Sequence, residues 1–177
     1  MKISEIYNLN KTQHELDFVD IDPANDKAVF LDPFFISTRP QPWCIEADRI
    51  LKNFFQYIID LIRLNQIDKA RSIFTHLNEP NETCLGLSQG IPQGKGAGKI
   101  DSQRIFDSIL ESRAVETGLV EDLEDTAIFI DGIANDKVSD MTTNIIKKHL
   151  ITYTQSQCDL WNIELTADVP SGFFGTQ

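Results

Sequence analysis

The stretch ELDFVDIDPANDKAVFLDPFFIS, residues 15–37, decides the fold class that the sequence predicts. Residues 15–22 alternate imperfectly between polar and apolar side chains, which favours a β-strand. The cluster PANDK, residues 23–27, is typical of a turn, and residues 28–37 form a second apolar run. Because Pro33 cannot donate a ladder hydrogen bond, the second strand is expected to end or bulge just before it. The stretch therefore predicts a β-hairpin.

Four segments show the three-to-four-residue spacing of apolar side chains that is typical of helices. The clearest is 45–64, whose wide apolar stripe predicts a helix near the centre of the core. The others are expected over 68–77, from a cap at Asp101 or Ser102 to about Gly118, and from Asn135 or Asp136 through Tyr153.

Three further apolar runs predict strands: TCLGLS at 83–88, AIFIDG at 127–132 and WNIELTADV at 161–169. Strands and helices are interleaved, but the first two strands read as a hairpin. The sequence therefore predicts an α+β fold, with a mixed β-sheet whose N-terminal hairpin packs against about four helices, ahead of a doubly wound parallel sheet. We expect a single α+β domain over 1–177.

The last residues, SGFFGTQ at 171–177, place two phenylalanines beside two glycines. Exposed, they would be an apolar liability, so they are expected to pack into the core or against a partner. The other interpretation is that the chain is the N-terminal part of a longer protein.

The chain carries 16 basic and 27 acidic residues, which gives a net charge of −11. This acidity argues against non-specific coating of nucleic acid, although it leaves room for a small basic cleft. Three cysteines lie far apart, which fits a reducing compartment. With no secretory signal and no apolar run long enough for a membrane span, we expect a cytoplasmic protein without membrane contact.

Two apolar runs end in aspartate, at Asp32 in VFLDP and at Asp131 in IFIDG. If the runs are neighbouring strands, the two carboxylates could share Mg²⁺ or Mn²⁺. The alternative is that both are ordinary turn formers, since aspartate is common before proline and glycine.

The stretch GIPQGKGAGKIDSQRIF, residues 90–106, combines closely spaced glycines with Lys95, Lys99 and Arg104. A loop that leads into a helix can hold a phosphate through its backbone N–H groups. However, the spacing of a P-loop is not met, because three residues rather than four separate Gly90 from the Gly-Lys pair. A mobile loop or lid is the preferred interpretation.

The stretch DGIANDKVSDMTTNIIKK, residues 131–148, is rich in residues that are mediocre helix formers. Its polar members recur every three to four residues and predict one polar helix face: Asp136, Asp140, Thr143, Asn144 and Lys147. This choice of residues suggests a shaped polar pocket. The alternative is N-capping followed by a solvated face. The histidines His14, His76 and His149 are dispersed, and none forms a recognisable catalytic unit.

The phrases LDFVDID…VFLDPFFIS and SRAVETGLVEDLEDTAIFIDGIANDKVSDMTTNII resemble a family of uncharacterised bacterial proteins associated with phage-defence gene neighbourhoods. The similarity spans most of the chain but includes no catalytic motif. It implies a bacterial cytoplasmic protein and a component of an antiviral defence assembly.

Three functions follow as hypotheses. The first is a non-enzymatic interaction or assembly component with a protein partner and no cofactor. The second is a Mg²⁺- or Mn²⁺-dependent phosphodiesterase or nuclease that uses the aspartates Asp32, Asp131, Asp136 and Asp140. The third is a nucleotide-binding module that uses the loop at 90–101. The first is preferred, because every motif that could carry chemistry is incomplete.

Overall fold

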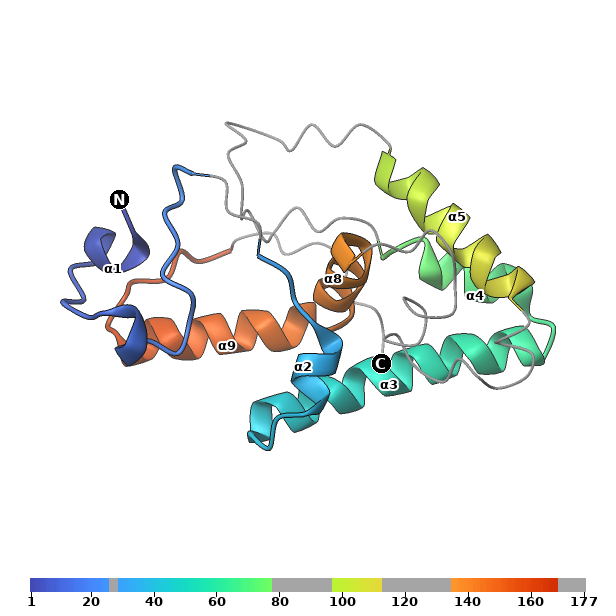
Figure 1. Cartoon of the computed structure of the whole chain (residues 1–177), viewed down its shortest axis with the longest axis horizontal. Helices are drawn as coiled ribbons and strands as arrows, with labels where there is room; N and C mark the ends of the chain where they lie inside the picture. The colour runs from blue at the N-terminus through green and yellow to red at the C-terminus, as the bar shows by residue number, and fades with distance from the viewer. Residues whose placement is uncertain (26–28, 78–96, 113–134, 169–177) are drawn as a thin grey trace. The chain divides into compact units, whose positions relative to one another are not determined.

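The computed structural model of the chain describes residues 1–25, 29–77, 97–112 and 135–168 (Figure 1). Within these residues the chain forms seven α-helices and a short 3-10 helix, and 64% of them are α-helical. These ranges contain no β-strand. The prediction of an α+β fold with a mixed β-sheet and an N-terminal hairpin is therefore wrong. The apolar runs at 83–88 and 127–132 lie outside the described residues.

The elements keep the labels of Figure 1. In chain order they are α1 (Ile3–Ile6), the 3-10 helix η1 (Gln13–Glu15), α2 (Pro33–Ser37), α3 (Pro42–Arg63), α4 (Ile67–Phe74), α5 (Ala97–Glu111), α8 (Asn135–Ile145) and α9 (Lys147–Leu160).

The first predicted strand, 15–22, fails because side chains occupy the backbone groups that a ladder would use. The Gln13 amide donates to the carbonyl oxygen of Phe18 at 2.8 Å, and its oxygen accepts from the N–H of Asp20 at 2.8 Å. Where this segment begins, Thr12 and Glu15 form a capping box around η1. Local side-chain bonds have thus replaced strand pairing.

Residues 33–37 of the second predicted strand form the helix α2 instead, and residue 28 lies outside the described residues. Asp32 is the N-cap of this helix and Pro33 is its first residue. Proline suits that position because its missing N–H would have no partner inside the helix, and its fixed φ angle is already helical. The pair that was expected to interrupt a strand therefore starts a helix.

The predicted helix over 45–64 is confirmed as α3, which begins earlier, at Pro42. It ends in a motif with Asn65 in the left-handed conformation at φ 58°. The N–H groups of Asn65 and Gln66 donate to the carbonyl oxygens of Ile62 and Leu61, which satisfies two of the last carbonyls of the helix.

The other predicted helices are present with different ends. The helix expected over 68–77 is α4, and the helix expected from Asp101 or Ser102 already begins at Ala97. The last helix begins at Asn135 as predicted, but it stops at Ile145, and α9 follows as a separate helix. After α9, Asn162 repeats the left-handed stop at φ 54°, so residues 161–168 are not a strand.

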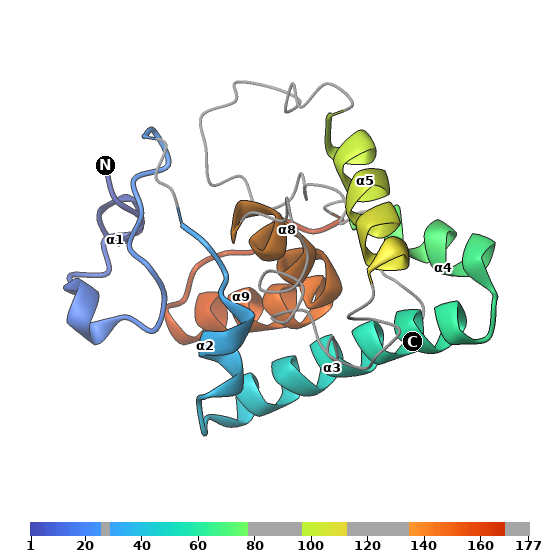
Figure 2. The ribbon, with the colours of Figure 1, turned by 45° about the vertical axis from the view of Figure 1, so that its right-hand side comes forward.

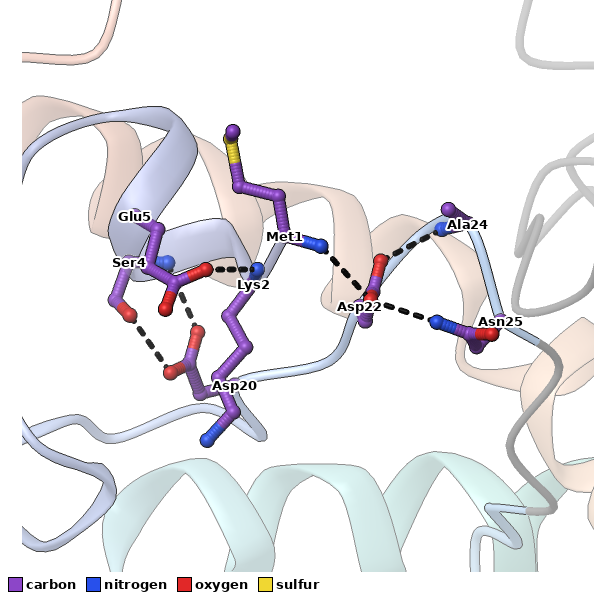
Figure 3. Close-up of polar contacts among 8 residues, drawn as sticks. All are labelled: Met1, Lys2, Ser4, Glu5, Asp20, Asp22, Ala24 and Asn25. Atoms are coloured by element: carbon purple, nitrogen blue, oxygen red, sulfur yellow. Dashed lines mark hydrogen bonds and ion pairs between the residues drawn. The ribbon is translucent and has the colours of Figure 1, made fainter.

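The chain divides into two compact units. The first contains α1, η1 and the part of α9 that begins at Leu150. In this unit the buried carboxylate of Asp20 accepts from the backbone N–H of Ser4 at 2.9 Å and from its hydroxyl at 2.7 Å (Figure 3). Asp22 pairs with the N-terminal amine at 2.8 Å. Polar bonds rather than a large apolar cluster thus hold the N-terminal segment together.

The second unit contains α2, α3, α4, α5, α8 and the first turn of α9. Both ribbon views place α2 beside the start of α3, with α4 and α5 near its other end (Figures 1 and 2). Its largest fully buried side chains are Phe55, Ile58, Ile59, Phe74, Phe106, Ile109, Thr142 and Ile146.

Candidate functional site

Helix α2 is a short helix with a well-defined start. The carboxylate oxygen Oδ1 of Asp32 accepts from the N–H groups of Phe34 at 2.9 Å and Phe35 at 3.3 Å. These two donors have no partner within the helix itself, so the cap stabilises a helix too short to form alone.

One face of α2 is anchored in the second unit. Pro33 and Ile36 lie three residues apart, so they share a face, and both are buried. Just before the helix, the N–H of Leu31 donates to the hydroxyl oxygen of Ser139 on α8 at 2.8 Å. The helix α2 is therefore fixed by the bond from Leu31 to Ser139, by its Asp32 cap and by the burial of Pro33 and Ile36.

The opposite side of α2 presents aromatic side chains to solvent. Phe34 is 64% exposed and Phe35 is 54% exposed. The guanidinium carbon of Arg39 lies 3.9 Å from the ring centroid of Phe35, a cation–π contact. We call Phe34, Phe35 and Arg39 the α2 surface. Its side chains are two aromatic rings and one guanidinium group.

Two more large apolar side chains near this surface in sequence are exposed, Phe30 before α2 and Ile45 in α3. Single exposed apolar residues are normal on proteins, so these two side chains are not counted in the α2 surface. The sequence analysis missed this surface because it placed Phe34 and Phe35 in a strand. The signal that could have revealed it is Asp32-Pro33, which reads as a cap and a first helical residue.

The predicted site residues are only partly placed. Asp32 caps α2, whereas Asp131 and Lys95 lie outside the described residues. Asp136 and Lys99 belong to helices α8 and α5, but their side chains are not among those described. The metal-sharing and phosphate-binding hypotheses therefore stay predictions.

The remaining candidates differ in exposure. Arg104 is an exposed residue of α5, and Asp140 is half-buried on α8. Thr143 is only 5% exposed and Lys147 only 9%, so neither side chain belongs to a solvated face. The Thr143 hydroxyl donates to the carbonyl oxygen of Ser139 at 2.8 Å, and the Asn144 amide donates to that of Asp140 at 3.2 Å.

The model of a protein family described as a domain of unknown function, DUF8370, matches residues 8–176. The chain belongs to this family. No curated protein and no solved structure matches it. Membership of the DUF8370 family therefore assigns no activity to the α2 surface or to the aspartates.

A second polar feature of this DUF8370 domain joins α3 to the start of α9. The rings of Trp43 and His149 are stacked with centroids 4.6 Å apart. Glu46 lies one turn along α3, where Arg49 binds its two carboxylate oxygens at 2.6 and 2.9 Å. These bonds lower the pKa of Glu46, and nearby His149 adds to the effect. More than 100 residues separate the stacked rings, so no sequence motif could reveal them.

Within 1–25, 29–77, 97–112 and 135–168, no group of three or more His, Cys, Asp or Glu side chains is arranged to hold a metal ion. In the same part of the chain, no helix is both long enough and apolar enough to cross a membrane. Neither finding extends to Asp131 or to residues 90–96.

Proposed function

We propose that this chain is a non-enzymatic interaction or assembly component that binds a partner protein through the α2 surface. In this proposal it works in the bacterial cytoplasm as part of an antiviral defence assembly, as the resemblance of its sequence implies. The proposal is supported chiefly by one observation, the exposure of Phe34 and Phe35 on a helix that is anchored on its other side.

The energetic argument concerns the cost of binding. Burying an exposed phenylalanine contributes roughly 1.5–3 kcal/mol. Association must offset the ordering of flexible groups, and that cost is smaller when the surface is already fixed. The capped and anchored α2 is such a surface. Aromatic and arginine side chains are also the types enriched among the residues that dominate interface energetics.

The charge of the chain indicates the chemistry of the partner. A net charge of −11 repels nucleic acid, anionic membranes and a second copy of the same chain. A partner protein with an apolar groove and a net positive charge suits both the exposed aromatic side chains and the net charge of the chain. Its association rate would then fall as salt increases, because screening weakens the attraction.

The experiment is site-specific photocrosslinking in cells that naturally produce the chain. A photoreactive phenylalanine derivative replaces Phe34 in one variant and Tyr57 in a matched control. Tyr57 is also an exposed aromatic residue of the second unit, but it lies on α3. We expect one discrete adduct from position 34 and none from position 57.

The crosslinked protein is then identified, purified and titrated against the chain. Phe34→Ala together with Phe35→Ala should weaken its affinity more than tenfold, whereas Tyr57→Ala should leave it unchanged. Equal crosslinking from the two positions, or a double variant with full affinity, would overturn the proposal.

A further inference from the structure

Helix α8 buries three hydroxyl-bearing side chains, and they are used in two ways. The hydroxyls of Thr142 and Thr143 donate to carbonyl oxygens one turn back on the same helix, at 2.7 and 2.8 Å. Ser139, which is only 7% exposed, instead accepts from the N–H of Leu31, a residue 108 positions away in sequence. The Ser139 hydroxyl therefore binds the segment around Leu31 rather than its own helix.

The held segment is the entry to α2. Leu31 directly precedes the cap residue Asp32, and Pro33 follows with no N–H of its own. A change in the backbone conformation at Leu31 would therefore change the orientation of α2. Serine is also a poorer helix former than alanine, so its place in the middle of α8 costs local stability.

We propose that Ser139 is a positioning residue for the α2 surface, which fixes the orientation in which Phe34 and Phe35 meet the partner. This inference rests on the proposed function. The bond to Ser139 satisfies a part-buried donor that would otherwise lose its acceptor. The buried face of α2, with Pro33 and Ile36, then settles in one arrangement, and binding has no further ordering to do.

The test is amide hydrogen exchange in the purified chain, followed residue by residue by NMR. Ser139→Ala removes the acceptor and replaces serine by a better helix former. We expect the Leu31 amide to exchange about tenfold faster, the change that corresponds to one net hydrogen bond. The amides of Phe34 and Phe35 should follow, while those of α3 stay unchanged.

Thr142→Val is the matched control, because it removes a buried hydroxyl that bonds within α8. It should leave the exchange of Leu31 unchanged. Ser139→Cys keeps a small side chain with a weaker acceptor and should give intermediate protection. This second variant keeps the comparison open if Ser139→Ala lowers the stability of the whole unit.

The inference is overturned if Leu31 is equally protected in wild type and Ser139→Ala, or if Thr142→Val exposes it as much. Its failure is distinguishable from failure of the proposed function. Exchange at Leu31 tests the Ser139 contact without any partner, whereas crosslinking from position 34 tests the partner. A protected Leu31 amide that depends on Ser139, combined with no adduct from position 34, would remove the proposed function alone.

Discussion

The imidazole of His149 stacks on the indole of Trp43, with 26° between the ring planes, and its Nε2 lies 3.0 Å from the carbonyl oxygen of Trp43. A single side chain at the start of α9 thus makes an aromatic and a polar contact with the first turn of α3. Because both contacts are local, removing the ring should loosen this junction before it affects α4 or α5.

His149→Ala should lower the free energy of unfolding of the second unit by roughly 1–3 kcal/mol, the sum of one hydrogen bond and one aromatic pair. The measurement is urea unfolding followed by tryptophan fluorescence. It is made with Trp161→Phe, so that Trp43 is the single tryptophan of the chain. His149→Phe keeps a stacking ring and should recover part of the loss. An unchanged midpoint for His149→Ala would show that the contact contributes nothing.

Asp32→Ala should destabilise α2 by about 0.5–2 kcal/mol, the usual cost of losing an N-cap. Asparagine caps as well as aspartate, so Asp32→Asn should keep the helix while it removes the charge. Amide exchange at Phe34 and Phe35 is the measurement, and it should rise in the alanine variant alone.

The same pair of variants addresses the metal-dependent alternative. In calorimetric titrations with Mg²⁺ and Mn²⁺, wild type and Asp32→Asn should behave alike, because the cap and not a cation is the role assigned to Asp32. Cation binding that disappears in Asp32→Asn would instead support the phosphodiesterase or nuclease hypothesis.

The first unit should lose stability in acid. The pKa of Glu15 is lowered to about 2, first by the backbone N–H of Thr12 and then by Lys11 and the Thr12 hydroxyl. Burial raises the pKa of Asp20, but the bonds from Ser4 outweigh it and leave the pKa lowered. Groups with depressed pKa values stabilise the folded state above their ordinary range, and this contribution disappears as the pH falls from about 4.5 towards 2.

Carboxyl carbon chemical shifts, followed by NMR from pH 7 to 2, measure this effect. Lys11→Met removes the ion pair at 2.9 Å but keeps the capping box, so the pKa of Glu15 should move part of the way back. A wild-type Glu15 that titrates at its ordinary value of about 4.5 would contradict the prediction.

Phe106→Ala should cost about 3–5 kcal/mol, since it removes a fully buried ring. The ring centroids of Phe106 and of Phe74 on α4 lie 5.5 Å apart. The guanidinium carbon of Arg71 lies 4.8 Å from the centroid of the Phe106 ring. Arg104→Ala, an exposed change on the same helix, should stay within about 0.5 kcal/mol. Thermal unfolding by circular dichroism compares the two, and similar midpoints would mean that α5 does not pack on α4.

The sequence predicted α3, α4, α5 and the start of α8, but it failed over 15–37, where short-range polar bonds decide the backbone. Periodicity identified α3 because its apolar residues recur over 22 residues. The segments 15–22 and 28–37, which were predicted as strands, are short. Gln13 and Asp32 form hydrogen bonds with their backbone groups, and the pattern of apolar residues carries no signal of these bonds.

The site followed the same division. Thr143 and Lys147 were expected on one polar face of a single helix, but Thr143 lies in α8 and Lys147 is the first residue of α9. Their burial depends on packing between segments, which the spacing of polar residues does not reveal. The bonds from Leu31 to Ser139 and from His149 to Trp43 likewise join residues more than 100 positions apart.

The exposed phenylalanines of α2 also affect the self-association of the chain in solution. At neutral pH each copy of the chain carries a net charge of −11, and the repulsion between copies keeps two α2 helices from associating. Near the isoelectric point that the composition predicts, about 4.6, that repulsion vanishes, while the hydrophobicity of the two rings is unchanged. Colloidal precipitation should therefore begin around that pH and retreat when Phe34 and Phe35 are replaced by serine.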